Sequence, residues 1–158
     1  MPIYMNVDGV TGDVTAQGHE KWIEVKTFSW GVGRGITMPV GGDTDREASV
    51  PSVSEIVVTK DSDAASTDLM KKAFTGDGVT VKFDFVRTGS GQFDPYYTFE
   101  LTNTLISGFS MDSGGDRPKE TLSLNFTKYQ FTDTPADPKN DSGSPKRFSY
   151  DLSTGVAS

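Results

Sequence analysis

The side chains that could do chemistry in this chain are one histidine and a set of carboxylates. His19 is the single histidine among the 158 residues, and the chain contains no cysteine. No serine or aspartate arrangement accompanies His19 in its polar segment, so we interpret it as a surface histidine rather than a catalytic base. The lack of cysteine excludes disulfides, thiol catalysis and zinc sites of the cysteine type.

Acidic residues gather in three clusters that we assign to loops, namely Asp43, Asp45 and Glu47; Asp61, Asp63 and Asp68; and Asp112 and Asp116. Sequence does not distinguish the paired carboxylates of a glycosidase from solvated acids of this kind. The run 61–63 begins like a calcium-binding EF-hand loop, but the glycine at position 6 and the glutamate at position 12 are missing, so helix capping explains it better. No P-loop, HExxH or GxSxG motif is present. We therefore expect no enzyme activity, no cofactor and no metal ion.

Three alternating glycines, Gly31, Gly33 and Gly35, partly match a dinucleotide-binding fingerprint. That fingerprint needs a further glycine and a following helix. Residues 37–51 are instead polar and contain Pro39. A flexible exit from a strand is the better interpretation of these glycines.

Composition favours a soluble β-rich protein with an acidic surface. The 17 glycines and the hydrophobic content of 34% indicate β-structure with many turns. The net charge of −7 argues against nucleic-acid binding, which needs a basic face. The N-terminus lacks the basic and apolar regions of a signal peptide, and the longest aliphatic run, 56–58, is too short for a membrane span. We expect synthesis in the cytoplasm, no membrane insertion, and a separate route if the protein leaves the cell.

Residues 96–131 organise the chain, and they read as two long strands joined by a glycine-rich turn at 113–118. In the first strand apolar side chains alternate with polar ones, which predicts one buried face. The members of that face are Tyr97, Phe99, Leu101, Leu105, Phe109 and Met111. In the second strand the alternation switches at Tyr129. The switch predicts a bulge or a strand end that is buried on both sides.

The same alternation predicts shorter strands at 2–7, 22–32, 54–60, 79–87 and 148–152. The strand at 22–32 is partly apolar on both faces, which fits either a core strand of a monomer or a strand that meets a partner on one face. Asp84 is assigned to the outward face of its strand, and the strand at 148–152 is expected to close the sheet.

One helix is predicted near residues 63–75, and Gly76 is its expected end. Its apolar stripe, interpreted as packing on a barrel, comprises Ala65, Leu69, Met70, Ala73 and Phe74. Two irregular segments complete the chain. The long loop at 34–54 is a candidate for contacting another subunit, and the segment 132–147 is a polar linker.

Four motifs, in order along residues 3–131, resemble those of the Hcp (haemolysin-coregulated protein) family, the tube subunits of bacterial type VI secretion systems. Residues 59–69 match a strand-to-helix signature "TK-x-x-D-x-A-S-x-x-L". Tyr4 to Gly9 match "Y-x-x-x-D-G", and Ile23 to Gly31 are similar to "I-E-V-x-S-F-S-W-G". The segment from Gly114 to Lys128, with its Arg-Pro pair and a following glutamate, resembles the fourth motif.

This resemblance implies a mainly β fold in one domain over residues 1–158, an antiparallel barrel of two packed sheets with one flanking helix, like phage tail-tube proteins. It implies hexameric rings that stack into a hollow tube, which a contractile sheath expels with a spike protein at its tip. The lumen would hold small effector proteins, so that each subunit is conduit, carrier and chaperone, secreted without a signal peptide. Candidate subunit or ring contacts are Trp30, Arg34, Met38, Asp45, Arg46 and Arg117.

The alternative from another functional class is a monomeric secreted β-domain that acts as an enzyme or binds carbohydrate. A cleft of convergent carboxylates in a monomer would favour it, whereas a ring-sized oligomer would favour the tube subunit.

Overall fold

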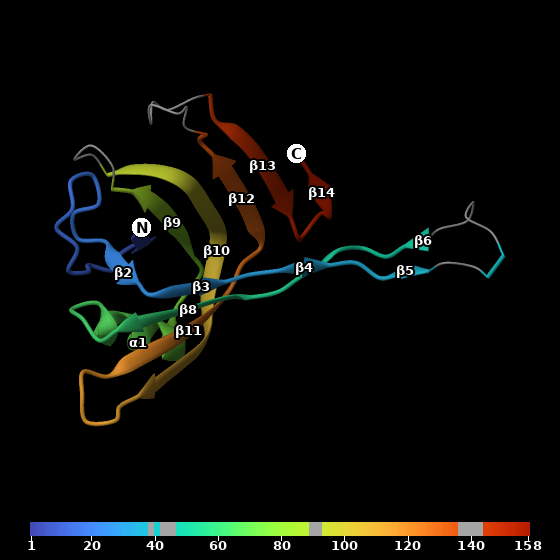
Figure 1. The fold of residues 1–158 in the computed structure, drawn as a ribbon. Helices are drawn as coiled ribbons and strands as arrows, with labels where there is room; N and C mark the ends of the chain where they lie inside the picture. Colours follow the sequence, from blue (N-terminus) through green and yellow to red (C-terminus); the bar gives the residue numbers. More distant parts are fainter. Residues whose placement is uncertain (38–39, 42–46, 89–92, 136–143) are drawn as a thin grey trace.

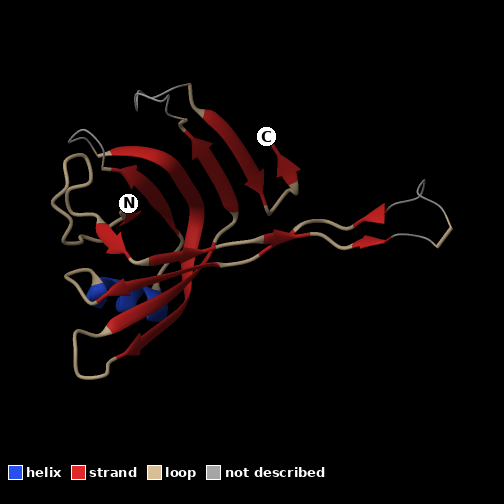
Figure 2. Ribbon diagram, viewed as in Figure 1, coloured by secondary structure: helices blue, strands red, loops and turns tan. Residues whose placement is uncertain are grey.

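The structure is a computed structural model that describes residues 1–37, 40–41, 47–88, 93–135 and 144–158. Over these residues the fold is mainly β, with antiparallel sheets and a single helix packed on one side of a barrel (Figure 2). The predicted fold class is therefore confirmed. Met38, Asp45 and Arg46 lie outside the described residues.

The barrel is built around β10, the long strand that both sheets share (Figure 1). Its strands are β1 (Ile3–Val7), β2 (Ile23–Val25), β3 (Thr27–Ser29), β8 (Ile56–Asp61), β9 (Val79–Arg87), β10 (Asp94–Asp112) and β11 (Lys119–Asn125). On one side β10 pairs with β9, which continues through β1 to β2; on the other it pairs with β11, which continues through β8 to β3. The barrel closes where β2 runs directly into β3. At this junction the Lys26 N–H donates to the carbonyl of Thr59 on β8 at 2.7 Å.

The single buried face predicted for β10 is wrong at Tyr97, which is exposed, and again beyond the middle of the strand. Asn103 has a φ of 52°, in the left-handed region, and the pairing with β9 shifts register there. A second irregularity follows between Ile106 and Gly108 in the pairing with β11. Each irregularity changes which face a side chain occupies. Thr104 is consequently buried, whereas Leu105 and Met111 are exposed.

The switch in alternation at Tyr129 is a strand end. β11 stops at Asn125 and β12 (Lys128–Asp133) starts after two intervening residues. β11 pairs with the second half of β10, and β12 pairs with the first half. Phe126 and Tyr129 are both buried where the chain crosses from one sheet to the other.

Three strands extend the sheet beyond the barrel, and we call them the wing. They are β12, β13 (Lys146–Asp151) and β14 (Val156–Ala157), in that order away from β10. The last strand was expected to close the sheet, which is wrong for β13, because it lies between β12 and β14. The chain reverses at Gly155, whose φ is 70° and whose N–H donates to the Asp151 carbonyl. The outer edge of the wing is thus β14.

Where the structure describes it, the segment expected to be a long loop is a narrow two-stranded extension, which we call the arm (residues 31–37, 40–41 and 47–54). It contains two antiparallel pairs, β4 (Val32–Gly33) with β7 (Ser52–Val53), and β5 (Ile36–Thr37) with β6 (Glu47–Ala48). The predicted strand at 22–32 is accordingly divided among β2, β3 and β4. The arm projects away from the barrel into open space (Figure 1).

The helix α1 (Ser66–Thr75) packs on the barrel through a narrower stripe than predicted. Ala65 and Leu69 are fully buried, but Met70 and Phe74 are exposed. The expected stripe is therefore wrong at those two positions. Met70 and Phe74 lie on the side of the helix beside the end of β10, and the barrel does not cover them. Gly76 ends the helix as predicted; a Cβ there would lie 2.4 Å from the Lys72 carbonyl oxygen.

Candidate functional site

A cluster of charged side chains is buried where β8 meets α1 and β11. The Lys60 ammonium lies 2.9 Å from Asp63 Oδ1 and 3.0 Å from Glu120 Oε2. The Ser66 hydroxyl donates to the same Glu120 oxygen at 3.0 Å. Lys60 is 1% exposed and Glu120 is 0% exposed. The Lys60–Glu120 pair is closed to solvent, so we interpret it as an ion pair that holds β8, α1 and β11 together.

The cluster also fixes the entry of α1, although not as the predicted cap. The N-cap residue is Ala65, and no side chain caps the helix itself. Asp63 instead accepts the Ala65 N–H with the oxygen that meets Lys60, and its own N–H donates to the Ser66 hydroxyl. One acidic residue thereby joins the ion cluster to the turn that precedes the helix.

The prediction that His19 is a surface histidine is wrong. It is 4% exposed, and its Nε2 lies 2.8 Å from Asp84 Oδ2. Asp84, assigned to the outward face of β9, is buried as well and accepts the Thr98 hydroxyl at 2.9 Å. The segment before β2 folds over this face, and the His19 ring packs against Tyr4 and Trp22. The pairing joins residues 65 positions apart, so no local spacing could reveal it.

His19→Leu is expected to reduce the free energy of unfolding by about 1–3 kcal/mol, because it leaves the buried Asp84 carboxylate without its imidazole partner. The double variant His19→Leu/Asp84→Leu should recover part of that loss, since both polar groups are then gone. Urea unfolding followed by tryptophan fluorescence measures it. Glu20→Ala, at the exposed neighbouring position, is the matched control. Equal stability of His19→Leu and this control would contradict the buried pair.

An apolar pocket of about 120 Å³ lies between the root of the arm and the wing, and we call it the arm-root pocket. Its lining residues are Trp30, Val32, Pro51, Val53, Tyr129, Phe148 and Tyr150. Trp30 stacks on Tyr129 with ring centres 4.7 Å apart and planes 3° apart. Burial raises the pKa of Tyr129 to about 12. The contacts around this pocket anchor the root of the arm on the wing.

A second apolar surface lies between α1 and the end of β10, and we call it the helix groove. Its volume is about 590 Å³, and its lining residues are Met70, Ala73, Phe74, Ser107, Gly108, Phe109 and Met111. Phe74 is 84% exposed, which is unusual for an aromatic side chain on a folded domain. Exposed apolar surface of this kind commonly marks a binding site.

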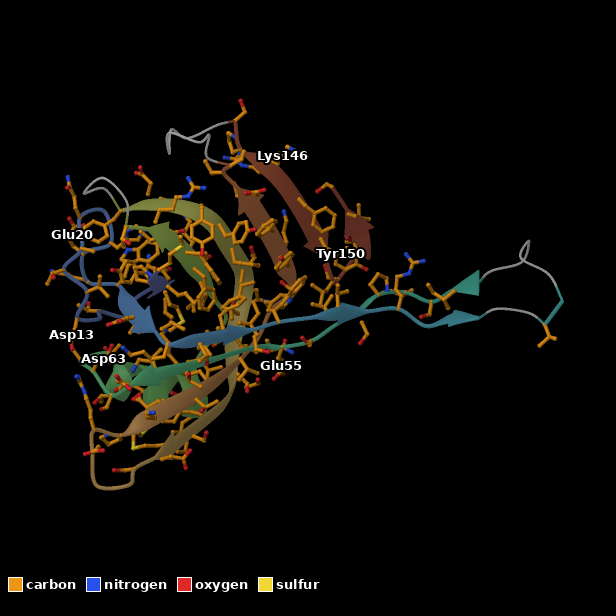
Figure 3. All side chains as sticks on the ribbon, viewed as in Figure 1. Asp13, Glu20, Glu55, Asp63, Lys146 and Tyr150 are labelled. Atoms are coloured by element: carbon orange, nitrogen blue, oxygen red, sulfur yellow. The ribbon has the colours of Figure 1, made fainter. Side chains whose placement is uncertain are left out.

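A charged pocket of about 150 Å³ lies beside the start of α1, and Asp13 and Asp63 lie at this end of the barrel (Figure 3). Its charged lining residues are Asp13, Glu24, Lys26, Asp61, Asp63 and Arg117. Most of the carboxylates have structural partners: Asp13 accepts the Ala64 N–H, Asp63 meets Lys60, and Glu24 meets Lys26. Over the described residues, no three histidine or acidic side chains are placed to hold a metal ion.

The candidate contact residues are distributed over two distant regions. Trp30 and Arg34 lie at the root of the arm, Trp30 half-buried and Arg34 exposed. Arg117 lies in the turn between β10 and β11, beside the charged pocket. Sequence reasoning missed the helix groove, because the alternation that assigned Met111 to a buried face did not reveal the irregularities in β10.

Comparison with known proteins connects this geometry to a family. The family described as "Type VI secretion system effector, Hcp" matches residues 4–132, most of the chain. The chain belongs to the Hcp family. The Hcp signatures in the sequence supply the buried cluster: the strand-to-helix motif contributes Lys60, Asp63 and Ser66, and the later motif contributes Glu120. No curated protein sequence matches the chain.

Solved structures share the Hcp fold over nearly the whole length. A type six secretion system protein has a TM-score of 0.89 at 26% identity, with 99% of both chains covered. Hcp1 from Salmonella typhimurium has a TM-score of 0.80 at 19% identity, over 99% of this chain and 98% of that one. A type VI secretion system effector from Yersinia pestis has a TM-score of 0.74 at 21% identity, over 94% and 98%.

The chain is thus a type VI secretion protein of the Hcp type. The helix that the structure describes is too short and too polar to cross a membrane, and the other described residues form no further helix.

Proposed function

We propose that this Hcp protein is a tube subunit of a type VI secretion system, a single tube domain over residues 1–158 that acts by assembly rather than by catalysis. Six copies close into a ring, and rings stack into a hollow tube that carries small effector proteins out of the cell. A contractile sheath and a spike protein are the expected partners of the tube. Membership of the Hcp family supports this role.

The arm is the observation that carries the proposal. It is held at its root by Trp30 and the arm-root pocket, and beyond that root Ile36, Val40 and Val50 are exposed. Isolated two-stranded ribbons are marginally stable in water, so an apolar ribbon without a covering layer is expected to gain one from another molecule. The candidate contacts Trp30 and Arg34 sit where such a neighbour would meet the barrel.

The wing offers a second means of association. β14 is the outer strand of its sheet, and Val156 is exposed on it. A strand edge with free backbone groups pairs readily with another chain, and a closed ring covers every such edge. Contacts between two different surfaces of the same chain form a closed ring when the rotation between neighbouring copies divides a full turn evenly.

The purified protein is expected to form a particle of about six times the 17.1 kDa chain mass. Size-exclusion chromatography with light scattering measures the mass, and negative-stain microscopy shows whether the particle is a ring. A Trp30→Ala variant should lower the assembled fraction, because it removes the stacking partner of Tyr129 at the arm root. A single monomeric species at every concentration tested would refute the tube-subunit proposal.

A further inference from the structure

The methionine side chains that the structure describes are divided between the N-terminus, the core and the helix groove. Met1 is the exposed first residue, and Met5 is 0% exposed within the core cluster. Met70 on α1 and Met111 at the end of β10 are 37% and 45% exposed, and both line the groove. Two thioethers from different elements thus meet solvent at one apolar surface.

The thioether is the oxidisable sulfur of this protein, because the chain contains no cysteine to compete for an oxidant. Hydrogen peroxide transfers one oxygen atom to the sulfur: an S–O bond forms, the O–O bond breaks, and water leaves. The sulfur loses two electrons, and the peroxide gains them. The product, methionine sulfoxide, is polar and chiral, whereas methionine is flexible and apolar. Enzymatic reduction reverses the change.

We propose that Met70 and Met111 form a site of reversible methionine oxidation, at which peroxide makes the helix groove partly polar while the fold stays intact. Both sulfurs lie on a surface that peroxide reaches without any opening of the chain. The sulfur of Met5 is sealed in the core, and exposing a core residue costs up to the full free energy of unfolding. The site belongs to the single chain, so its absence would leave the tube-subunit proposal standing.

The fold tolerates the change because neither groove methionine holds its element in place. Leu69, not Met70, is the buried residue of α1. Met111 pairs with Glu120 through the backbone of β10 and β11, which a sulfoxide leaves untouched. Each new oxygen would also lie at an exposed position, where water hydrates it, so no polar group is buried without a partner.

Peroxide treatment of the purified full chain tests the site directly. Peptide mass spectrometry after trypsin digestion follows Met70 and Met111 separately, since they fall in different tryptic peptides, and fragment ions separate Met5 from Met1. Met70 and Met111 should each oxidise at least tenfold faster than Met5. In urea that unfolds the chain, the three rates should become similar, because burial no longer protects Met5. Groove methionines as slow as Met5 in the folded protein would overturn the proposal.

The change in polarity has its own test, with Met70→Leu/Met111→Leu as the matched control. Leucine keeps both positions apolar at similar volume, and this variant retains Met1, Met5 and Met38. Peroxide should shorten the retention of the unchanged chain on a hydrophobic-interaction column, and methionine sulfoxide reductases A and B should restore it. Circular dichroism should stay the same throughout. An equal shift in the double variant, or loss of the folded spectrum on oxidation, would overturn the proposal.

Discussion

Lys60→Met is expected to destabilise the folded chain by about 3–5 kcal/mol, because it leaves the carboxylates of Glu120 and Asp63 without their buried cation. Total stabilities of domains are only about 5–15 kcal/mol, so the variant should lie near the limit of folding. Lys60 is the shared partner of both acids, at 2.9 and 3.0 Å, and water does not reach the ammonium to compensate. Urea unfolding at one fixed protein concentration measures the effect, since self-association shifts apparent stability.

The double variant Lys60→Met/Glu120→Leu removes both charges of the buried pair, so it shows how much of the loss in Lys60→Met comes from the unpaired Glu120 carboxylate. Apolar residues of similar volume can replace a buried ion pair with little loss, so most of the stability should return. Lys26→Met is the matched control, because Lys26 meets Glu24 at the surface with both side chains about half exposed. Surface pairs contribute about 0–1 kcal/mol. A Lys60→Met variant as stable as Lys26→Met would show that the cluster does not hold α1 to β8 and β11.

Leu69→Asp is expected to prevent folding, because it places an unpaired carboxylate in the core beneath α1. Leu69 is fully buried, and burying an unpaired charge costs several kcal/mol. Leu69→Ala should remain folded with a loss of about 2–5 kcal/mol, which is the usual range for a leucine truncated in a core. Circular dichroism and thermal unfolding distinguish an unfolded Leu69→Asp protein from a folded but destabilised Leu69→Ala protein and from the unchanged chain.

Thr67→Asp is the control for Leu69→Asp, since Thr67 is exposed on the same helix. Surface changes of this kind usually shift stability by no more than about 0.5 kcal/mol. A soluble and folded Leu69→Asp protein would mean that α1 presents this side chain to solvent or to a partner instead of to the barrel.

The sequence predicted the elements whose side chains alternate or recur locally. β9 was expected at 79–87 and spans Val79–Arg87, β1 and β8 lie within two residues of their expected bounds, and α1 falls within 63–75. The Hcp resemblance and the barrel were also readable, because four ordered motifs span most of the chain and the family match over residues 4–132 agrees with them.

The hydrophobic pattern gave wrong predictions where a backbone irregularity or packing between distant segments decides whether a side chain is buried. The positive φ at Asn103 and the register shift near Gly108 are not visible in a hydrophobic pattern, so the exposure of Leu105 and Met111 was missed. The arm was taken for a loop because each of its strands is only two residues long. Strands this short leave no measurable alternation.

What the sequence alone determined is the fold class, the single helix, the family and the lack of thiol chemistry. These follow from residue types, local periodicity and motif order, which belong to the chain before it folds. Only the tertiary structure decided that Lys60 meets Glu120, that His19 is buried on Asp84, and that Phe74 stays exposed in a groove. Each of these depends on which distant strands become neighbours, and free energy, not spacing along the chain, selects those neighbours.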